Sequence, residues 1–361
     1  MESKINKNQT KEENKEENKE KNLTKRKRKR MPLITIGTSV KKKYKKKCGS
    51  KNKNKKVLPS SSKGNNLTET NIKNNNNNNN ININYNKNEE TSSSNIDNEI
   101  TIYLNIKEDD INKKIYFLSE NSLKELDNTN ATLYINGEKH NFQKYKIFNT
   151  TGEYIIKIKF NIILESSYEM FFLCKEITNI DLSLFKTHKI KNMSSMFRSC
   201  NGIKNLNLSS FVTSKVDHMN QMFYNCKNLI NINLSSFNIK NVISLNSMFY
   251  NCENLVYLNL SSYNTKNVTD MSYMFYNCCN LLELDLSSFY TNNVENVEYM
   301  FANCKKLANL NLSSFNFDKV RNKNNMFRDC DNLDNIIVNN ILYGKIEREI
   351  HKYNVTIVYL E

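Results

Sequence analysis

Residues 242–267 read VISLNSMFYNCENLVYLNLSSYNTKN, and the next 26 residues, 268–293, read VTDMSYMFYNCCNLLELDLSSFYTNN. Both stretches carry a Met-Phe pair, a Cys three positions after the Phe, and a Leu-x-Leu-Ser-Ser element. Self-similarity at a fixed period is typical of architectures in which each unit buries its apolar face against its neighbours. The two stretches therefore predict a stack of 26-residue coils.

The repeat extends well beyond these two units. Val216, Leu208 and their equivalents return with the same step of 26 residues. The repeat cysteines show no drift over seven units, and they are Cys174, Cys200, Cys226, Cys252, Cys278, Cys304 and Cys330. A single coil cannot bury its own apolar face, whereas stacked coils can. We therefore expect a seven-coil solenoid over residues 168–340.

Each unit contains two hydrophobic periods. Val268, Met271, Met274 and Phe275 follow the spacing of one face of a short helix, which a preceding asparagine can cap. The Leu-x-Leu element at 284–286 alternates as a strand does. The predicted fold class is an α/β solenoid, a leucine-rich-repeat-like right-handed coil with one short parallel strand and a short helix per repeat.

The unit M-F-x-x-C-x-x-L-x-x-L-x-L-S-S-F resembles the repeat of the BspA-type leucine-rich-repeat proteins over residues 168–338. The resemblance implies a binding scaffold, with a surface location and adhesion in some bacterial members. Two features depart from that pattern. The aspartate of the family's L-D-L element is present at Asp181 and Asp285 but is asparagine at 207, 233, 259 and 311, and the charged first 24 residues lack the apolar core of a secretory signal.

Both flanks of the repeat predict caps. Residues 96–167 contain four strand-like stretches, at 100–106, 114–118, 131–135 and 154–160, with an Asn136-Gly137 turn signal and a short helix starting near 122–126. We expect a small β-rich N-terminal cap domain there. Residues 341–361, helix-like from 346 to 353 and strand-like from 355 to 360, predict a C-terminal cap.

Charge separates the first 95 residues from the rest. They hold 25 of the 53 Lys and Arg but 9 of the 37 Asp and Glu, which leaves 28 of each sign, and no net charge, for residues 96–361. A Lys/Asn-rich segment with few apolar residues predicts a disordered tail. Its two basic blocks have the spacing of a bipartite nuclear-localisation signal, with candidate signal residues Lys29, Arg30, Lys41, Lys42 and Lys43. The alternatives are a solvated tail and weak anionic contact with nucleic acid or acidic lipid.

The cysteines predict a buried structural ladder. Adjacent coils bring equivalent cysteines within bridging range, but parallel side chains disfavour disulfides. A zinc site needs closely spaced ligand pairs, and a catalytic thiol needs a positioned base, whereas the chain has four His at no recognisable motif distance. We expect no cofactor, no metal and no small-molecule substrate.

The outward positions of the predicted strands are the candidate partner-binding face. The row between the leucines holds Asp in two coils and Asn in four, and an asparagine ladder is the alternative role for it. Neighbouring positions vary between coils, and Tyr257 is the aromatic anchor among them. The candidates are Asp181, Lys204, Asn205, Asn207, Asn231, Asn233, Tyr257, Asn259, Glu283, Asp285, Asn309 and Asn311.

These patterns favour a non-enzymatic scaffold that binds an unidentified protein partner through the sheet face of the solenoid. A BspA-type cell-surface adhesin is the first alternative, and a nuclear or nucleic-acid-associated protein acting through the basic tail is the second. No apolar run approaches 18 residues, so we expect no transmembrane segment. An intracellular location, the nucleus included, is favoured over the cell surface.

Overall fold

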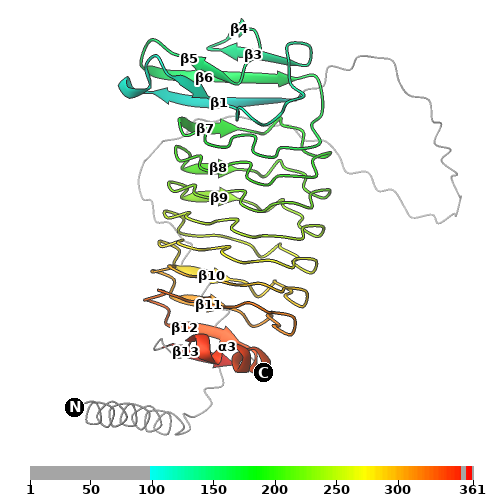
Figure 1. Ribbon diagram of the computed structural model, residues 1–361, viewed down its shortest axis with the longest axis vertical. Helices are drawn as coiled ribbons and strands as arrows, with labels where there is room; N and C mark the ends of the chain where they lie inside the picture. The colour runs from blue at the N-terminus through cyan, green and yellow to red at the C-terminus, as the bar shows by residue number, and fades with distance from the viewer. Residues whose placement is uncertain (1–97, 351–354, 360–361) are drawn as a thin grey trace, which may run out of the picture. The chain divides into compact units, whose positions relative to one another are not determined.

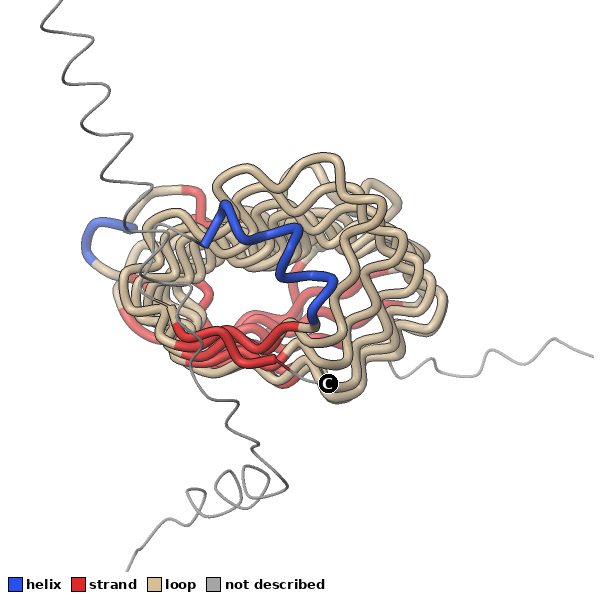
Figure 2. The backbone as a smooth tube through the Cα atoms, turned by 90° about the horizontal axis from the view of Figure 1, so that it is seen from below, coloured by secondary structure: helices blue, strands red, loops and turns tan. Residues whose placement is uncertain are grey.

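The computed structural model describes residues 98–350 and 355–359, which form a stack of flattened coils within the unit 88–361 (Figure 1). The strands lie along one long side of the stack, and turns and loops return along the other (Figure 2). Within these residues, no helix has the length and apolar character needed to cross a membrane. The predicted tail, residues 1–95 with its two basic blocks, lies outside the described residues.

The N-terminal cap is an antiparallel sheet of order β4-β3-β6-β1-β7. Its strands are β1 (Glu99–Ile106), β3 (Ala131–Ile135), β4 (Glu138–His140), β6 (Gly152–Phe160) and β7 (Ile177–Asp181). A second pair joins β2 (Lys114–Tyr116) to β5 (Tyr145–Ile147), and a single 3-10 turn, η1, spans Glu108–Asp110. The four predicted strands are confirmed in position.

Three details of the cap refine the prediction. The hairpin between β3 and β4 is confirmed, since Asn136 and Gly137 both have a positive φ, 50° and 89°. Strands β4 and β5 lie outside the predicted strands, because each is only three residues long and neither has an alternating apolar run. Residues 122–126 form turns and not the short helix expected there.

The cap and the solenoid share one sheet, because β7 belongs to the first coil. Strand β1 pairs antiparallel with β7, so it covers the strand edge that the first coil would otherwise leave open. Alternate residues of β1 are buried, namely Ile100, Ile102, Leu104 and Ile106. Burying each such side chain contributes roughly 1.5–3 kcal/mol, and these side chains belong to one hydrophobic core that continues into the solenoid.

One short parallel strand recurs in most coils. After β7 come β8 (Asn205–Asn207), β9 (Asn231–Asn233), β10 (Glu283–Asp285), β11 (Asn309–Asn311) and β12 (Asn335–Val338). The register is one repeat per coil, as in the pairs Asn205–Asn231 and Asn309–Asn335. In the fourth coil, residues 257–259 form no strand, and the sheet is interrupted there (Figure 1).

The expected helix in each repeat is wrong. Residues 272–277 and their equivalents form a ribbon of consecutive turns, and residues 268–271 before them hold one isolated bridge, at Asp270. In the second coil, the amides of Ser195 and Phe197 donate to carbonyls of the third coil, at 3.0 and 2.9 Å, while the amides of Met196 and Arg198 close turns within their own coil. Serine 195 has a φ of 56°, a value that no α-helix contains. The neighbouring coil supplies backbone carbonyl acceptors that an α-helix would not use. The spacing of the apolar residues fits both an α-helix and this ribbon of turns.

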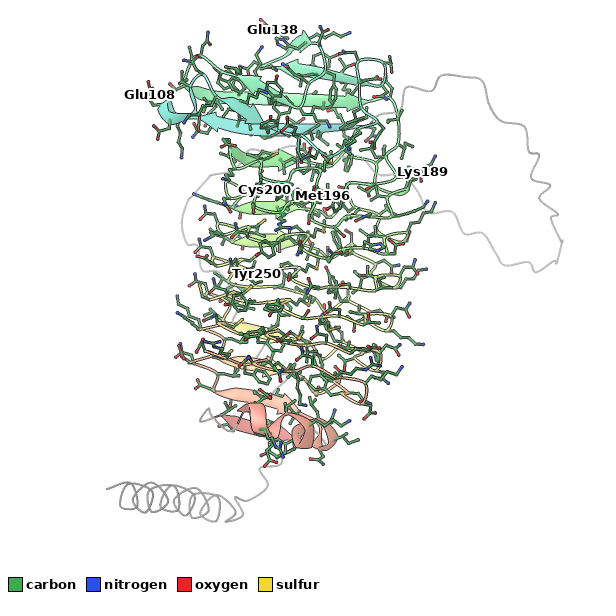
Figure 3. The ribbon with its side chains drawn as sticks, in the orientation of Figure 1. Glu108, Glu138, Lys189, Met196, Cys200 and Tyr250 are labelled. Carbon is green, nitrogen blue, oxygen red and sulfur yellow. The ribbon has the colours of Figure 1, made fainter. Side chains whose placement is uncertain are left out.

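The core of the solenoid consists of columns of equivalent side chains. One column of stacked phenylalanines runs from Phe171 to Phe327, with ring centroids 5.3 to 5.8 Å apart. A second runs from Phe185 to Phe315, with Tyr263 in place of one phenylalanine. The methionine at position 196 and the cysteine at position 200, labelled in Figure 3, lie in the same buried interior.

The C-terminal end is closed by α3 (Asn340–Ile350), which begins six residues before the predicted helix, and by β13 (Thr356–Tyr359), which lies within the predicted strand. The side chain of Asn339 accepts a hydrogen bond from the amide of Leu342 at 2.7 Å and so caps the helix. Helix α3 buries Leu342, Ile346 and Ile350, and β13 pairs in parallel with β12. The last coil is thereby covered as the first one is.

Candidate binding surfaces

The predicted face residues all lie on the sheet side of the solenoid. They occupy β7 to β11, the residue before β8, or the matching segment of the fourth coil. Ten of the twelve are exposed, and Asn309 and Asn311 are half-buried. The sequence therefore placed them together on one surface, although no ligand or partner identifies that surface as a binding site.

The Asp/Asn row between the leucines has a local structural role. In the first six coils, its Oδ1 atom accepts a hydrogen bond from the amide of the serine two residues later, whereas the seventh coil has Ile337 at this position. The distance is 2.9 Å from Asp181 to Ser183 and 3.1 Å from Asn207 to Ser209. These are Asx turns, which need only an acceptor oxygen and so accommodate either residue type. The same hydrogen bonds from Ser183 hold the pKa of Asp181 below its usual value.

An asparagine ladder lies one column away. Asn231 donates to Asn205 at 2.8 Å, and Asn335 donates to Asn309 at 2.9 Å. Between these pairs the column holds Tyr257 and Glu283 instead of asparagine. The ladder is therefore broken in the middle of the sheet face.

Apolar side chains gather at this break. Ile230, Tyr257 and Leu282 come from three successive coils and are 38%, 58% and 37% exposed. We name them the sheet-face patch. The amide of Leu282 donates to the carbonyl of Val256 at 3.3 Å, which holds the fourth and fifth coils together beside the patch. Core packing does not require these three side chains, because the adjacent Leu258 and Leu284 already point inward.

The sheet face continues into an open hollow on the cap, with a volume of about 990 Å³. Tyr103, Tyr134 and Ile155 form its apolar part, and Thr178 and Asn179 of the first coil form its rim. Lys157 lies 3.0 Å from Glu99, and Lys159 lies 6.0 Å from the centre of the Tyr134 ring. This hollow could not be predicted from the sequence, because the hollow depends on the pairing of β1 with both β6 and β7.

A second group of aromatic residues lies on the ribbon of turns, on the side of the coil away from the strands. The rings of Tyr224, Tyr250 and Tyr276 stack at 4.5 and 4.7 Å, and those of Tyr273 and Tyr299 stack beside them at 5.0 Å. We name these five residues the tyrosine patch; Figure 3 labels Tyr250 within it. All five are half-buried. A signal was present in the sequence, since tyrosine directly follows Met-Phe in three successive repeats.

Arg198 closes one end of the tyrosine patch. Its guanidinium lies 4.6 Å from the centre of the Tyr224 ring, and Nη1 donates to Gln221 at 2.8 Å. Burial, followed by the neighbouring tyrosines, raises the pKa of Tyr250 and so favours its neutral form further. The patch thus combines aromatic area with uncharged hydroxyl groups.

The repeat cysteines are packed as core residues. All seven are buried, and each thiol from Cys200 onward donates to the phenylalanine carbonyl of the preceding coil, as from Cys252 to Phe223 at 3.2 Å. Burial raises the pKa of Cys226 and of Cys330 to about 12. Every cysteine among the described residues is free, and no cluster of three or more His, Cys, Asp or Glu there is placed to hold a metal ion.

A family model described as "Mycoplasma protein of unknown function, DUF285" matches residues 141–258, 165–283 and 230–340. None of the curated proteins matches the chain. A crystallised leucine-rich repeat protein of Bacteroides ovatus is 14% identical, with 47% of this chain and 64% of that one covered and a TM-score of 0.18. A leucine-rich repeat protein of Leptospira interrogans is 16% identical, with 51% and 61% covered and a TM-score of 0.17. The chain spans less than two thirds of either structure.

Proposed function

The chain belongs to the DUF285 family, and on that premise we propose that it is a non-enzymatic scaffold that binds a protein partner through the sheet face of its solenoid. The observation that carries the proposal is the sheet-face patch. Three apolar side chains from successive coils are exposed around the fourth coil, which has no strand at 257–259 and where the asparagine ladder is interrupted.

The exposed side chains of the sheet-face patch favour contact with a partner, because burial would stabilise them. Full burial of such a side chain from full exposure is worth roughly 1.5–3 kcal/mol, so exposed fractions of 37–58% leave roughly 0.5–1.5 kcal/mol for each that the protein's own core does not supply. Tyrosine is enriched among residues that dominate interface energies, and Tyr257 is the most exposed of the three. The surrounding polar row, with Asn231, Asn259 and Glu283, supports the hydrogen-bonding rim that such interfaces have.

The proposal is tested by comparing Tyr257→Ser with Tyr290→Ser. Both tyrosines are 58% exposed, but Tyr290 lies on the loops beyond the strands. Each full-length variant is immobilised and incubated with lysate of the native cells, and the retained proteins are quantified by mass spectrometry. We expect a protein retained by the wild type and by Tyr290→Ser to be lost with Tyr257→Ser. Identical sets of retained proteins for all three would contradict the proposal.

We also propose that the coil is right-handed, that the N-terminal cap spans residues 96–167 and the solenoid residues 168–340, and that the chain is related to BspA-type surface proteins. A role as an adhesin predicts labelling of the protein on intact cells. Binding of nucleic acid or acidic lipid through the tail predicts salt-sensitive binding that is lost on deleting residues 1–60.

A further inference from the structure

We propose that the tyrosine patch is a second binding surface, and that it takes a proline-rich segment in the polyproline II conformation. The patch does not overlap the sheet-face patch, since its residues lie on the ribbon of turns. Neither surface requires the other to function.

The five rings form one contiguous surface. Between the two stacks, the ring centroids lie 6.2 Å apart for Tyr250 and Tyr273, 5.8 Å for Tyr273 and Tyr276, and 6.2 Å for Tyr276 and Tyr299. Because the rings stack along the axis of the solenoid, they largely cover one another's faces, and all five residues stay partly exposed. Such a surface suits a ligand that offers apolar area together with hydrogen-bond acceptors.

The spacing of the rings selects the conformation of the ligand. Steps of 4.5 and 4.7 Å take the column from Tyr224 to Tyr276 over about 9 Å. One polyproline II turn of three residues rises about 9.3 Å, so equivalent prolines would meet alternate tyrosines. Same-side residues of a β-strand recur at about 6.7 Å and the turns of an α-helix at about 5.4 Å, and neither repeat matches one or two steps of the column.

The chemistry of the ligand fits the same surface. A polyproline II helix has no internal hydrogen bonds, so its carbonyls are available to tyrosine hydroxyl donors. Proline rings pack on aromatic side chains, and the preformed backbone loses little entropy on binding. Arg198, stacked on Tyr224, marks one end of the column. Beyond Tyr276 the column continues with the buried Ala302, so the run of rings ends there.

The test measures binding of fluorescein-labelled decaproline to the full chain by fluorescence anisotropy. We expect saturable binding that weakens at least tenfold in Tyr250→Ala and stays within twofold in Tyr257→Ala, the control on the sheet face. A labelled Gly-Ser peptide of equal length should not bind. Because Tyr250→Ala removes a stacked ring, its melting curve is recorded beside that of the wild type.

A second variant keeps the test decisive if Tyr250→Ala unfolds. Tyr276→Phe retains the ring and lacks the hydroxyl group, and we expect it to weaken decaproline binding about threefold. The proposal is overturned if decaproline does not bind at 1 mM or if the Gly-Ser peptide binds equally well. It is also overturned if Tyr276→Phe and every folded Tyr250 variant bind decaproline as tightly as the wild type does. These outcomes leave the sheet-face proposal untouched, because that is read out at Tyr257.

Discussion

Replacing Tyr263 by phenylalanine should stabilise the protein. Tyr263 occupies the second phenylalanine column, is 1% exposed, and stacks on Phe289 at 6.3 Å. Its hydroxyl group is buried and has no hydrogen-bond partner among the described residues. Burial alone raises its pKa far above the usual value for tyrosine, which agrees with an apolar surrounding. The other described positions of this column carry phenylalanine, so the phenylalanine ring fits the site.

The magnitude follows from the unpaired hydroxyl group. Leaving such a group buried costs about 1–3 kcal/mol, and Tyr263→Phe removes that cost while keeping the ring. For a folded unit of this size, each kcal/mol corresponds to roughly 2–4 °C in Tm, so we expect a rise of roughly 2–12 °C. The free energy of unfolding in urea should increase by about 1–3 kcal/mol, without a change in the denaturant slope.

The assay is thermal and urea unfolding of the full-length variants followed by circular dichroism. Phe289→Tyr is the reverse change in the next coil, and we expect it to destabilise the protein by a similar amount. Tyr290→Phe, at a 58% exposed residue, should leave stability within about 0.5 kcal/mol of the wild type. A loss of stability in Tyr263→Phe would refute the reasoning, because it would mean that the hydroxyl group has a favourable partner.

Three further predictions use the same unfolding measurements or a thiol titration. Gly202→Ala should lower the free energy of unfolding by about 3 kcal/mol, because the added Cβ would lie 2.2 Å from a backbone carbonyl oxygen of the preceding coil. Gly344→Ala, at an exposed position of α3 with nothing within 4 Å of the added Cβ, should raise it by up to about 1 kcal/mol. Equal effects of the two substitutions would contradict the packing described. In a Cys48→Ser background at pH 8, Ellman's reagent should label the half-buried Cys279 quickly and the seven repeat cysteines only on unfolding, and rapid labelling of more than one thiol would contradict the buried ladder. Burial raises the pKa of the Glu176 carboxyl group in the folded protein. The contribution of this group to stability is therefore full below its pKa in the unfolded chain and is lost as the pH rises through its pKa in the folded protein. Glu176→Gln should raise Tm at pH 7, and the gain should be smaller at pH 4.

The sequence was most informative where the apolar pattern alone determines the structure. Leu284 and Leu286 alternate around Asp285, and the structure has a strand there. The repeat cysteines return at a constant step with a small apolar side chain, and they are buried. In both cases the residue has the same surroundings in every coil, so the pattern of one repeat predicts the structure of the others.

The helix prediction failed because the deciding hydrogen bonds join residues 25 positions apart. Periodicity within one unit shows that Met271, Met274 and Phe275 point inward, but it does not show where their amides donate. The amide of Met271 donates to the carbonyl of Asn296 in the next coil, at 2.9 Å. Only the stacked arrangement reveals this acceptor.

The candidate sites were predicted unevenly for a similar reason. Tyr257 was found because it interrupts a polar column that the sequence displays directly. The tyrosine patch combines two columns whose proximity depends on the ribbon of turns, as the 6.2 Å between the rings of Tyr250 and Tyr273 shows. The hollow on the cap joins residues of β1, β3, β6 and β7, which are far apart in the chain.

The central claim is that the sheet face of the solenoid contacts a protein partner, and site-specific photo-crosslinking tests it most directly. Benzoylphenylalanine is introduced at position 257 or at position 290, two equally exposed positions of which only the first is on the sheet face. After irradiation of native cells, we predict a discrete crosslinked adduct from position 257 and none from position 290. An adduct at position 290 with none at 257 would contradict the claim.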